Sequence, residues 1–406
     1  METQVTKNRS LNEWLNILES RHNKKIDLGL TRIQQVYNNC KLAKIAPTII
    51  TVAGTNGKGS TVAILSSICQ SAEYKVGEFT SPHILKYNER IKVNSQNATD
   101  QQIIDAFKKV DENLNGISLS YFEYATLAAI IIFKQQNVDI AILEVGLGGR
   151  LDSVNVIDTD CAIITTIDID HTSWLGNDKE SIAFEKAGIM RINKPVIYGD
   201  EDCPASIIKH AKKTGAKLIF ADQFEENRYP NPNLLGQYQL KNAATAITAL
   251  HSIHPRLNIS EDSIKKGLKD IKLSGRLQTI AESPNIIVDV AHNKQACESL
   301  NSWLQSNPCQ GKTIAVFSVL DDKKAMDWLD IFKDSIDVWC ISVAQSERAM
   351  PIRDLLNVLV DSARLVTSFP SINEAFVNAQ IMASPEDRII VFGSFYSVSE
   401  VMQNSL

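Results

Sequence analysis

The chain of 406 residues has few cysteines, and their spacing does not suit a metal site or a disulfide framework. The seven cysteines are odd in number and widely separated, and no Cys-X-X-Cys pair occurs. Small disulfide-rich domains and structural zinc sites need regular, close spacing. We therefore expect free, mostly buried thiols and a reducing cytoplasmic location.

Long apolar runs and an excess of basic charge are also lacking. The longest apolar candidate, Ala125–Phe133, has about half of the roughly 18 residues that span a bilayer and is typical of a buried helix. The polar start METQVTKNRSLNEWL contains no apolar segment of a secretory signal. A net charge of −5 argues against a nucleic-acid partner. We expect neither a membrane nor a nucleic acid as partner, and a monomer.

The segment from Ile49 to Thr61, IITVAGTNGKGST, combines an apolar strand pattern with a glycine-rich loop. Gly54, Gly57 and Gly59 allow a sharp turn and a close approach of the backbone to an anion. Lys58 would add a positive charge at the outer phosphates, and a hydroxyl after it can ligate Mg²⁺. The pattern indicates a nucleoside triphosphate site.

The match to the phosphate-binding pattern G-X-X-X-X-G-K-[S/T] is incomplete. Val52 stands where the first glycine is expected, and Gly59 stands where the hydroxyl is expected. The simpler alternative is a glycine-rich turn that carries a surface lysine. The order of strand, loop and helix favours the phosphate site.

Short apolar runs alternate with helical patterns along the chain. Such runs are typical of a mainly parallel sheet that helices cover on both faces. These sheets bind ligands at the carboxyl ends of their strands, where we expect the glycine loop, Glu144 and His171. The predicted strands are Thr48–Ala53, Ile140–Val145, Cys161–Ile167, Pro195–Tyr198, Lys217–Ala221, Ile286–Val290, Thr313–Val319, Val338–Val343 and Arg388–Phe392.

A turn signal, Ser283-Pro284-Asn285, precedes a second series of strand and helix patterns. We therefore predict two α/β domains. Residues 1–282 would form a P-loop-containing domain with a mainly parallel sheet, and residues 283–406 a smaller, Rossmann-like domain. A cleft between two such domains would suit a nucleotide and its co-substrate.

The segment IAILEVGLGGRLD, from Ile140, ends a predicted strand with a carboxylate. Burial of Glu144 there would be costly without a metal ion or a cation, and pairing with Arg150 is the simpler alternative. The glycines do not fit the dinucleotide pattern G-X-G-X-X-G, because Leu151 occupies the position of the last glycine.

Several other polar residues follow predicted strands or turns, and each is weak by itself. Ser81, His171 and Lys186 could be a turn residue, a solvated histidine and a surface lysine. Arg276 lies just before the domain boundary, where it could reach a phosphoryl group or form a linker salt bridge. Asp289 and His292, in VDVAHN, follow a strand of the second domain and could meet a nucleotide.

Together these segments resemble the folate branch of the Mur-ligase-like amide synthetases, the folylpolyglutamate synthases, and more closely its bifunctional dihydrofolate synthase form. The early HNKKIDLGL, from His22, is similar to the N-terminal substrate loop of bifunctional members. The match runs in order over nearly the whole chain: AGTNGKGST from Ala53, TSPHILKYNER from Thr80, YFEYATLAA from Tyr121, LEVGLGGRLDSVN from Leu143, DHTSWLG from Asp170, EKAGI from Glu185, NAATA from Asn242, SGRLQ from Ser274 and DVAHN from Asp289.

The resemblance implies an ATP-dependent amide ligase. A carboxylate oxygen of the acceptor attacks the γ-phosphorus of ATP, and the amine of L-glutamate then displaces phosphate from the acyl phosphate. The implied acceptors are dihydropteroate and reduced folates. The implied cofactors are ATP and two Mg²⁺ ions, with K⁺ as a further candidate.

The site residues of the family are assigned here position by position. The implied catalytic residues are Lys58, Lys186, Arg276 and His292, with Lys186 carbamylated, which requires an uncharged amine and hence a lowered pKa. The implied metal ligands are Ser81, Glu144, His171 and Lys186. The implied nucleotide contacts are Thr55, Asn56, Gly57, Lys58, Gly59, Ser60, Asn242, Arg276 and Asp289. The implied pterin contacts are Tyr121, Phe122, Glu123, Leu151, Asp152 and Ser153.

The chain departs from the family pattern at a few positions. Lys294 stands where proline is usual, Tyr238 stands where histidine is frequent, and VLDDKK from Val319 matches only loosely. The alternatives are a monofunctional folylpolyglutamate synthase and a cell-wall Mur ligase, whose extra N-terminal domain is not evident. More distant alternatives are a nicotinamide-dependent oxidoreductase that uses GLGG and a non-catalytic nucleotide-binding module.

Overall fold

The computed structural model describes residues 9–24, 26–42, 44–254, 256–323, 325–359 and 365–405. The chain divides into two compact units, which are considered separately here. The first comprises Met1–Pro232 and Lys241–Ile271, and the second comprises Asn233–Leu240 and Lys272–Leu406. The division therefore falls at Ile271 rather than at residue 282, because the strand at Gln278–Glu282 pairs with the second sheet.

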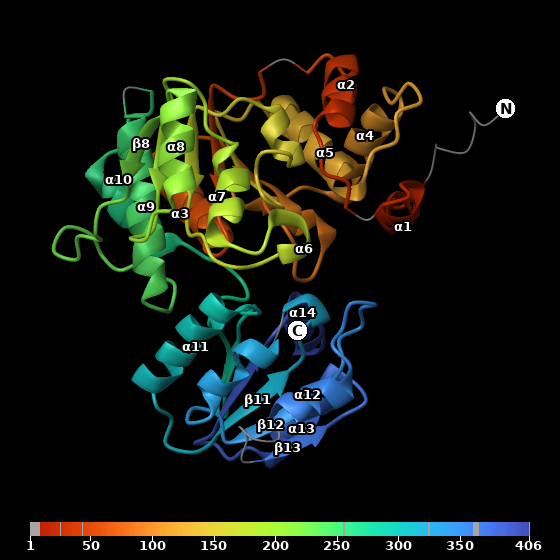
Figure 1. Ribbon diagram of the computed structural model, residues 1–406, viewed down its shortest axis with the longest axis vertical. Coiled ribbons are helices and arrows are strands. Elements are labelled where there is room, and N and C mark those ends of the chain that lie inside the picture. Colours follow the sequence, from red (N-terminus) through yellow and green to blue (C-terminus); the bar gives the residue numbers. More distant parts are fainter. Residues whose placement is uncertain are drawn as a thin grey trace. The chain divides into compact units, whose positions relative to one another are not determined.

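The first unit is built on an eight-stranded sheet with the order β4-β3-β2-β5-β1-β6-β7-β8. One edge strand, β8, is labelled in Figure 1. The strands from β2 to β8 in this order are parallel, and β3 and β4 extend one edge in antiparallel fashion. The bounds are β1 (Thr48–Ala53), β2 (Val76–Phe79), β3 (Ile91–Val93), β4 (Gln96–Asn97), β5 (Ile140–Glu144), β6 (Cys161–Ile164), β7 (Pro195–Tyr198) and β8 (Lys217–Phe220).

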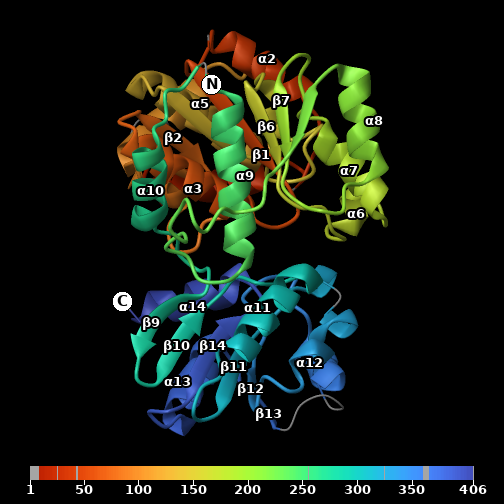
Figure 2. The same cartoon turned by 90° about the vertical axis from the view of Figure 1, so that its left-hand side faces the viewer.

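Helices cover both faces of this sheet because its central strands are apolar on both sides. Ile49, Ala141 and Leu143 belong to the core that includes α4 and α5, whereas α3 packs on β1, β2 and β5 and against α10. In Figure 2, α3, α9 and α10 lie in front of the sheet. The bounds are α1 (Leu11–Arg21), α2 (Thr31–Asn39), α3 (Lys58–Ser71), α4 (Asp100–Asp111), α5 (Tyr121–Gln136), α6 (Thr172–Leu175), α7 (Lys179–Ala187), α8 (Ala205–Thr214), α9 (Tyr238–Ser252) and α10 (Glu261–Asp270), with 3₁₀ turns η1 (Tyr87–Arg90) and η2 (Ser153–Val156).

The second unit has a six-stranded sheet with the order β13-β12-β11-β14-β10-β9, parallel except for β9. Phe317, Phe332, Trp339 and Phe392 form its aromatic core, and the ring centroids of Phe317 and Phe392 are 4.9 Å apart. The bounds are β9 (Gln278–Glu282), β10 (Asn285–Val288), β11 (Thr313–Phe317), β12 (Val338–Ile341), β13 (Val366–Ser368), β14 (Arg388–Phe392), α11 (Lys294–Ser306), α12 (Ile352–Leu359), α13 (Ile372–Met382), α14 (Phe395–Ser405), η3 (Asp321–Lys323), η4 (Ala325–Asp327) and η5 (Leu329–Phe332).

All nine predicted strands are present, and Ala125–Phe133 is a buried part of α5 as predicted. The prediction missed β2, β3, β4, β9 and β13, which are short or only partly buried and carry no long apolar run. The first eight residues of the N-terminal segment lie outside the described residues. Among the residues described, no helix combines the length and apolarity needed to cross a bilayer.

Candidate active site

The glycine loop turns from β1 into α3 by means of left-handed backbone conformations. Gly54 has φ +149° and Gly57 has φ +84°, which residues with a Cβ rarely adopt. A Cβ at Gly54 would collide with the Thr165 side chain, and one at Gly57 would lie 2.5 Å from Asn242 Oδ1. The loop is therefore packed tightly enough that only glycine fits at both positions.

Hydrogen bonds tie this loop to the segment after β6. The Thr55 amide donates to the Thr166 carbonyl (2.8 Å), and the Asn56 amide donates to Thr166 Oγ1 (3.1 Å). Thr165 Oγ1 in turn donates to the Asn56 carbonyl (2.5 Å). Thr165 and Thr166 were not predicted as site residues, although their position at the end of a predicted strand was a usable signal. Their hydrogen bonds hold the glycine loop at the carboxyl ends of β1 and β6.

The departures from the phosphate-binding pattern have a structural explanation. Val52 is a buried strand residue whose parallel neighbour is Glu144, so the loop begins only at Gly54. Ser60, the first hydroxyl after the lysine, is buried in the first turn of α3. Lys58 Nζ donates to the carbonyl oxygens of Gly54 (2.9 Å) and Thr55 (3.1 Å). The lysine thus lies across its own loop.

Glu144 and Ser81 lie close together at the carboxyl ends of neighbouring strands. Glu144 ends β5 beside the glycine loop, and β2 lies on the other side of β5. The Ser81 amide donates to Glu144 Oε2 (3.1 Å), and the Glu144 side chain is buried. Arg150 does not supply the cation of the simpler alternative, since its Nη2 pairs with Glu185 Oε1 at 2.8 Å.

A pocket lies at the carboxyl ends of these strands in the first unit. His171 enters it from the loop after β6, where its backbone has φ +52° and precedes α6. Lys186 lies near the end of α7 and also lines the pocket. The complete lining is Gly54, Thr55, Lys58, Val145, Gly146, Leu147, Gly148, Asp170, His171, Leu175 and Lys186.

The electrostatics of the pocket favour an uncharged amine on Lys186. Burial, with the cation of Lys58 as a further cause, lowers the pKa of Lys186 to about 7, although Asp170 and Asp152 act in the opposite direction. A buried ammonium ion loses its hydration, so the neutral form is favoured. A neutral amine is the form that carbamylation of Lys186, which the family resemblance implies, would require.

The predicted pterin residues lie on two neighbouring segments. Tyr121 and Phe122 begin α5, and the Phe122 ring is stacked on Phe79 with centroids 5.6 Å apart. A Cβ at Gly146 would lie 2.6 Å from Phe122 Cζ, so Phe122 contacts the loop that lines the pocket. Glu123 is more buried and caps α5, with Oε2 accepting the Ser120 amide (2.8 Å).

The other pterin segment is held mainly by its own hydrogen bonds. Asp152 accepts the Leu147 amide (2.8 Å) and the Val154 amide (3.0 Å), and burial raises the pKa of Asp152 to about 6. Ser153 Oγ lies 2.5 Å from Thr126 Oγ1, and the Leu151 carbonyl accepts the Gly29 amide (3.1 Å). In the described structure, Asp152 and Ser153 shape the loop.

The predicted nucleotide residues of the second unit form a separate cluster. Asp289 accepts the amides of Leu277 (2.8 Å) and Ala291 (2.7 Å), and burial raises its pKa. The Arg276 guanidinium lies 5.6 Å from the centre of the Phe395 ring, and the His292 ring lies 5.9 Å from the same ring. Phe395 therefore connects Arg276 and His292, which sequence analysis did not foresee.

Two residues that depart from the family pattern, Lys294 and Tyr238, lie at the beginnings of helices. Lys294 is the first residue of α11, a position that suits proline but does not require it. Asn293 caps that helix by accepting the Ala296 amide (3.1 Å). Tyr238 begins α9 and is close to Gly236, where a Cβ would lie 2.5 Å from Tyr238 Cε1. In VLDDKK, Lys324 lies outside the described residues.

Family models match most of the chain. The Mur ligase middle domain matches residues 52–234, and the Mur ligase, glutamate ligase domain matches residues 275–395. The glycine loop, Glu144 and Lys186 fall in the first match, and Arg276 and His292 fall in the second. Fold and site therefore define a ligase of the Mur type.

Relatives narrow this class. The dihydrofolate synthase/folylpolyglutamate synthase of Escherichia coli (strain K12) is 40% identical, with 97% of this chain and 95% of the relative covered. E. coli FolC in complex with DHPP and ADP has a TM-score of 0.92 at 40% identity, covering 98% of this chain and 97% of that one. The Yersinia pestis bifunctional enzyme complexed with AMPPNP and Mn ion has a TM-score of 0.91 at 39% identity, covering 99% of both chains. The chain belongs to the dihydrofolate synthase/folylpolyglutamate synthase family.

Family membership overturns the two distant alternatives. The GLGG segment is followed by the short turn η2, whereas a dinucleotide site needs a helix after its glycines. An oxidoreductase is therefore rejected, as is a module without catalysis, since the chain shares its fold and nearly its whole length with ligases.

Proposed function

We propose that this member of the ligase family joins L-glutamate to dihydropteroate and to reduced folates, with ATP hydrolysed to ADP and phosphate. The observation that carries the proposal is the pocket that holds Lys58, His171 and Lys186 beside the glycine loop and Glu144. Support comes from relatives of both activities, and from a bifunctional enzyme with Mn, AMPPNP and L-glutamate bound, which is 39% identical with a TM-score of 0.91.

The oxygen donors at Glu144 and Ser81 suit a divalent cation, and among the described residues no cluster of three His, Cys, Asp or Glu side chains forms a complete metal site. Glu144 is a carboxylate buried at a strand end, next to Ser81, and such oxygen donors suit a hard ion such as Mg²⁺. We propose Ser81, Glu144 and His171 as ligands, with carbamylated Lys186 for a second ion and K⁺ as a further candidate. When bound, the metal neutralises the charge that develops on the transferring phosphoryl group.

The protein's own groups have separate tasks in the reaction. The loop from Thr55 to Ser60 and Asn242 would hold the triphosphate, and Lys58 would leave its own loop carbonyls to meet the outer phosphates. Arg276, His292 and Asp289 would supply further nucleotide contacts. The acceptor carboxylate attacks the γ-phosphorus, ADP leaves, and the glutamate amine then displaces phosphate from the acyl phosphate.

We assign the acceptor to the wall beside Phe122. Tyr121 and Phe122 would contact the flat pterin ring, while Glu123, Leu151, Asp152 and Ser153 maintain the shape of the adjoining segments. A large aromatic surface with a few polar groups suits a planar heterocycle. The segment at Gly29, which bonds to Leu151, would complete this wall.

The proposal is tested by an ADP-release assay with purified chain. Dihydropteroate and tetrahydrofolate are supplied separately, each with and without L-glutamate. ADP release that needs glutamate with both acceptors is the expected result. Release with tetrahydrofolate alone would assign the monofunctional folylpolyglutamate synthase activity, and release with neither would reject the proposed function.

Two further properties are proposed with the activity. All seven cysteines are free, which suits a reducing cytoplasm, and fractionation of expressing cells tests this location. We also propose a monomer of 45.0 kDa, because the proposed ligands lie in one chain, and light scattering after gel filtration tests it.

A further inference from the structure

Besides the glycine loop and the His171 segment, two walls of the pocket come from separate parts of the chain. One wall is the loop after β5, represented by Val145–Gly148, and the other is the last turn of α7, which carries Lys186. The position of Lys186 relative to the loop therefore depends on contacts behind the pocket rather than on a continuous stretch of backbone.

Backbones meet directly at this junction. The Arg150 amide donates to the Glu185 carbonyl at 2.7 Å. A Cβ at Gly149 would lie 2.8 Å from the Glu185 carbonyl oxygen and 3.0 Å from that of Lys186, and one at Gly188 would collide with Arg150. These glycines let the loop contact the end of α7 with no side chain between them.

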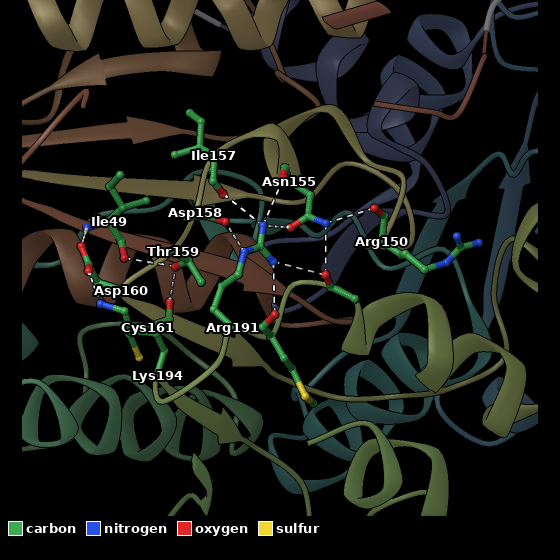
Figure 3. A network of polar contacts seen from close by, with 12 residues as sticks. Ile49, Arg150, Asn155, Ile157, Asp158, Thr159, Asp160, Cys161, Arg191 and Lys194 are labelled. Carbon is green, nitrogen blue, oxygen red and sulfur yellow. Dashed lines mark hydrogen bonds and ion pairs between the residues drawn. The ribbon is translucent and has the colours of Figure 1, made fainter. Parts of the chain in front are cut away.

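Asn155 joins the two walls through its side-chain amide. Its Nδ2 donates to the Arg150 carbonyl (3.0 Å) at the end of the loop (Figure 3). It also donates to the Gly188 carbonyl (3.1 Å), two residues beyond Lys186. Asn155 is only 8% exposed, so few water molecules could replace these bonds. Both amide hydrogens are used, which an aspartate of the same shape could not provide.

Arg191 holds Asn155 from the other side. Its Nη2 donates to Asn155 Oδ1 (2.9 Å) and to the Asn155 carbonyl (3.1 Å). Its Nη1 donates to the Gly188 carbonyl (3.4 Å). The guanidinium also pairs with the exposed Asp158 (Figure 3). Because a guanidinium is planar and rigid, it determines the orientation of the amide.

We propose that Asn155 and Arg191 are positioning residues of the ligase reaction, which hold the end of α7 and thereby Lys186 at a set place against the glycine-rich loop. The inference rests on the proposed function, in which Lys186 is carbamylated. Neither residue lines the pocket, so both act through the backbone. A displacement of about 1 Å in an active site can lower a rate about 100-fold.

The first test separates kcat from KM. Asn155→Asp should lower kcat about tenfold to 100-fold and leave KM for ATP and glutamate within about twofold. Arg191→Lys should lose less than Arg191→Met, since lysine keeps one cationic donor. Lys194→Met is the matched control, because Lys194 pairs with Asp160 (2.9 Å) in the neighbouring network of Figure 3 without bonding the loop or the end of α7, and its kcat should stay near that of the wild type.

The second test observes Lys186 without turnover. A carbamate signal from ¹³C-labelled bicarbonate is recorded by NMR, together with the thermal unfolding midpoint. We expect a weaker signal in Asn155→Asp and Arg191→Met than in Lys194→Met at comparable unfolding midpoints. Wild-type kcat and carbamate signal in folded Asn155→Asp and Arg191→Met would overturn the inference, as would losses that follow the unfolding midpoint alone. If Asn155→Asp does not fold, the two Arg191 variants decide.

Failure of the underlying function gives a different result. A wild-type chain that releases no acceptor-dependent ADP rejects the ligase reaction itself. A wild-type chain that is active but shows no carbamate removes only the proposed modification, and the kcat of the variants then decides the positioning role.

Discussion

Burial, and after it the positive charge of Lys58, lowers the pKa of Lys186, and both side chains line the same pocket of the first unit. One lysine follows the glycine loop and the other ends a helix more than a hundred residues later. Their proximity gives the two amines different tasks: the charged one suits a phosphate, and the neutral one suits reaction with CO₂.

Replacement of Lys58 by alanine should lower acceptor-dependent ADP release about 100-fold to 1000-fold, the typical effect of a lost electrostatic donor at a reacting group. The rate of ADP formation at saturating substrates measures this. Lys179→Ala is the control, since it removes a cation that pairs with Asp168 at 3.7 Å but is absent from the pocket lining. Equal activity of the two variants would contradict the assignment of Lys58.

The Glu144→Gln variant should need more Mg²⁺ for half-maximal activity and lose most of its rate at saturation, because a neutral amide is a weaker ligand for a hard cation. A titration of activity with Mg²⁺ gives both values. Glu78→Gln is the matched control: Glu78 is also buried, lies in the neighbouring strand β2, accepts the Ser66 hydroxyl (2.7 Å) and has its pKa raised by burial. A normal Mg²⁺ response of Glu144→Gln would remove Glu144 from the ligand set.

A Gly57→Ala variant should bind ATP more weakly and unfold at a lower temperature than Gly116→Ala. The two glycines have nearly the same backbone, with φ +84° and +83°, so the conformational cost of alanine is similar. Only Gly57 faces a neighbour, Asn242 Oδ1, at 2.5 Å from an added Cβ, whereas Gly116 has open space. Calorimetry of nucleotide binding and thermal unfolding compare the pair, and equal losses would show that the contact with Asn242 is unimportant.

Lys186→Met should stabilise the chain near neutral pH when CO₂ and nucleotide are absent. The pKa of Lys186 falls from 10.5 to about 7 on folding, so the unfolded chain binds more protons between these values. The destabilisation by wild-type lysine is therefore complete below pH 7, decreases as the pH rises, and disappears near 10.5. It amounts to at most about 5 kcal/mol. Denaturant unfolding at pH 6.5 and about pH 9.5 tests this, and a pH-independent difference between the proteins would refute it.

The Lys186→Met variant should also lose ligase activity, and full activity would contradict the metal role of Lys186.

Sequence patterns were sufficient for much of the architecture. All nine apolar runs are strands, since buried parallel strands require continuous apolar side chains. Edge strands such as β9 were missed and the domain boundary was placed about ten residues late, because a half-exposed strand carries a weak pattern and its pairing partner is set by tertiary contacts.

Some features of the candidate site could likewise be predicted from local sequence, and others could not. Gly54, Gly57 and Lys58 are adjacent in the chain, so their local pattern alone indicated a phosphate loop. The spacing of residues could not show that Arg150 does not pair with Glu144, because the actual partner of Arg150, Glu185, comes close only in the folded chain.

By itself, the sequence determined the nine apolar strands, the glycine loop and the family, because these depend on residues that are neighbours or recur in a regular order. Only the tertiary structure decided that Lys186 is buried beside Lys58, that Thr165 and Thr166 hold the loop, and that Asn155 and Arg191 join the two walls of the pocket. Burial and hydrogen-bond partners are set by segments far apart in the chain, and the pKa of a lysine follows from that environment rather than from its sequence neighbours.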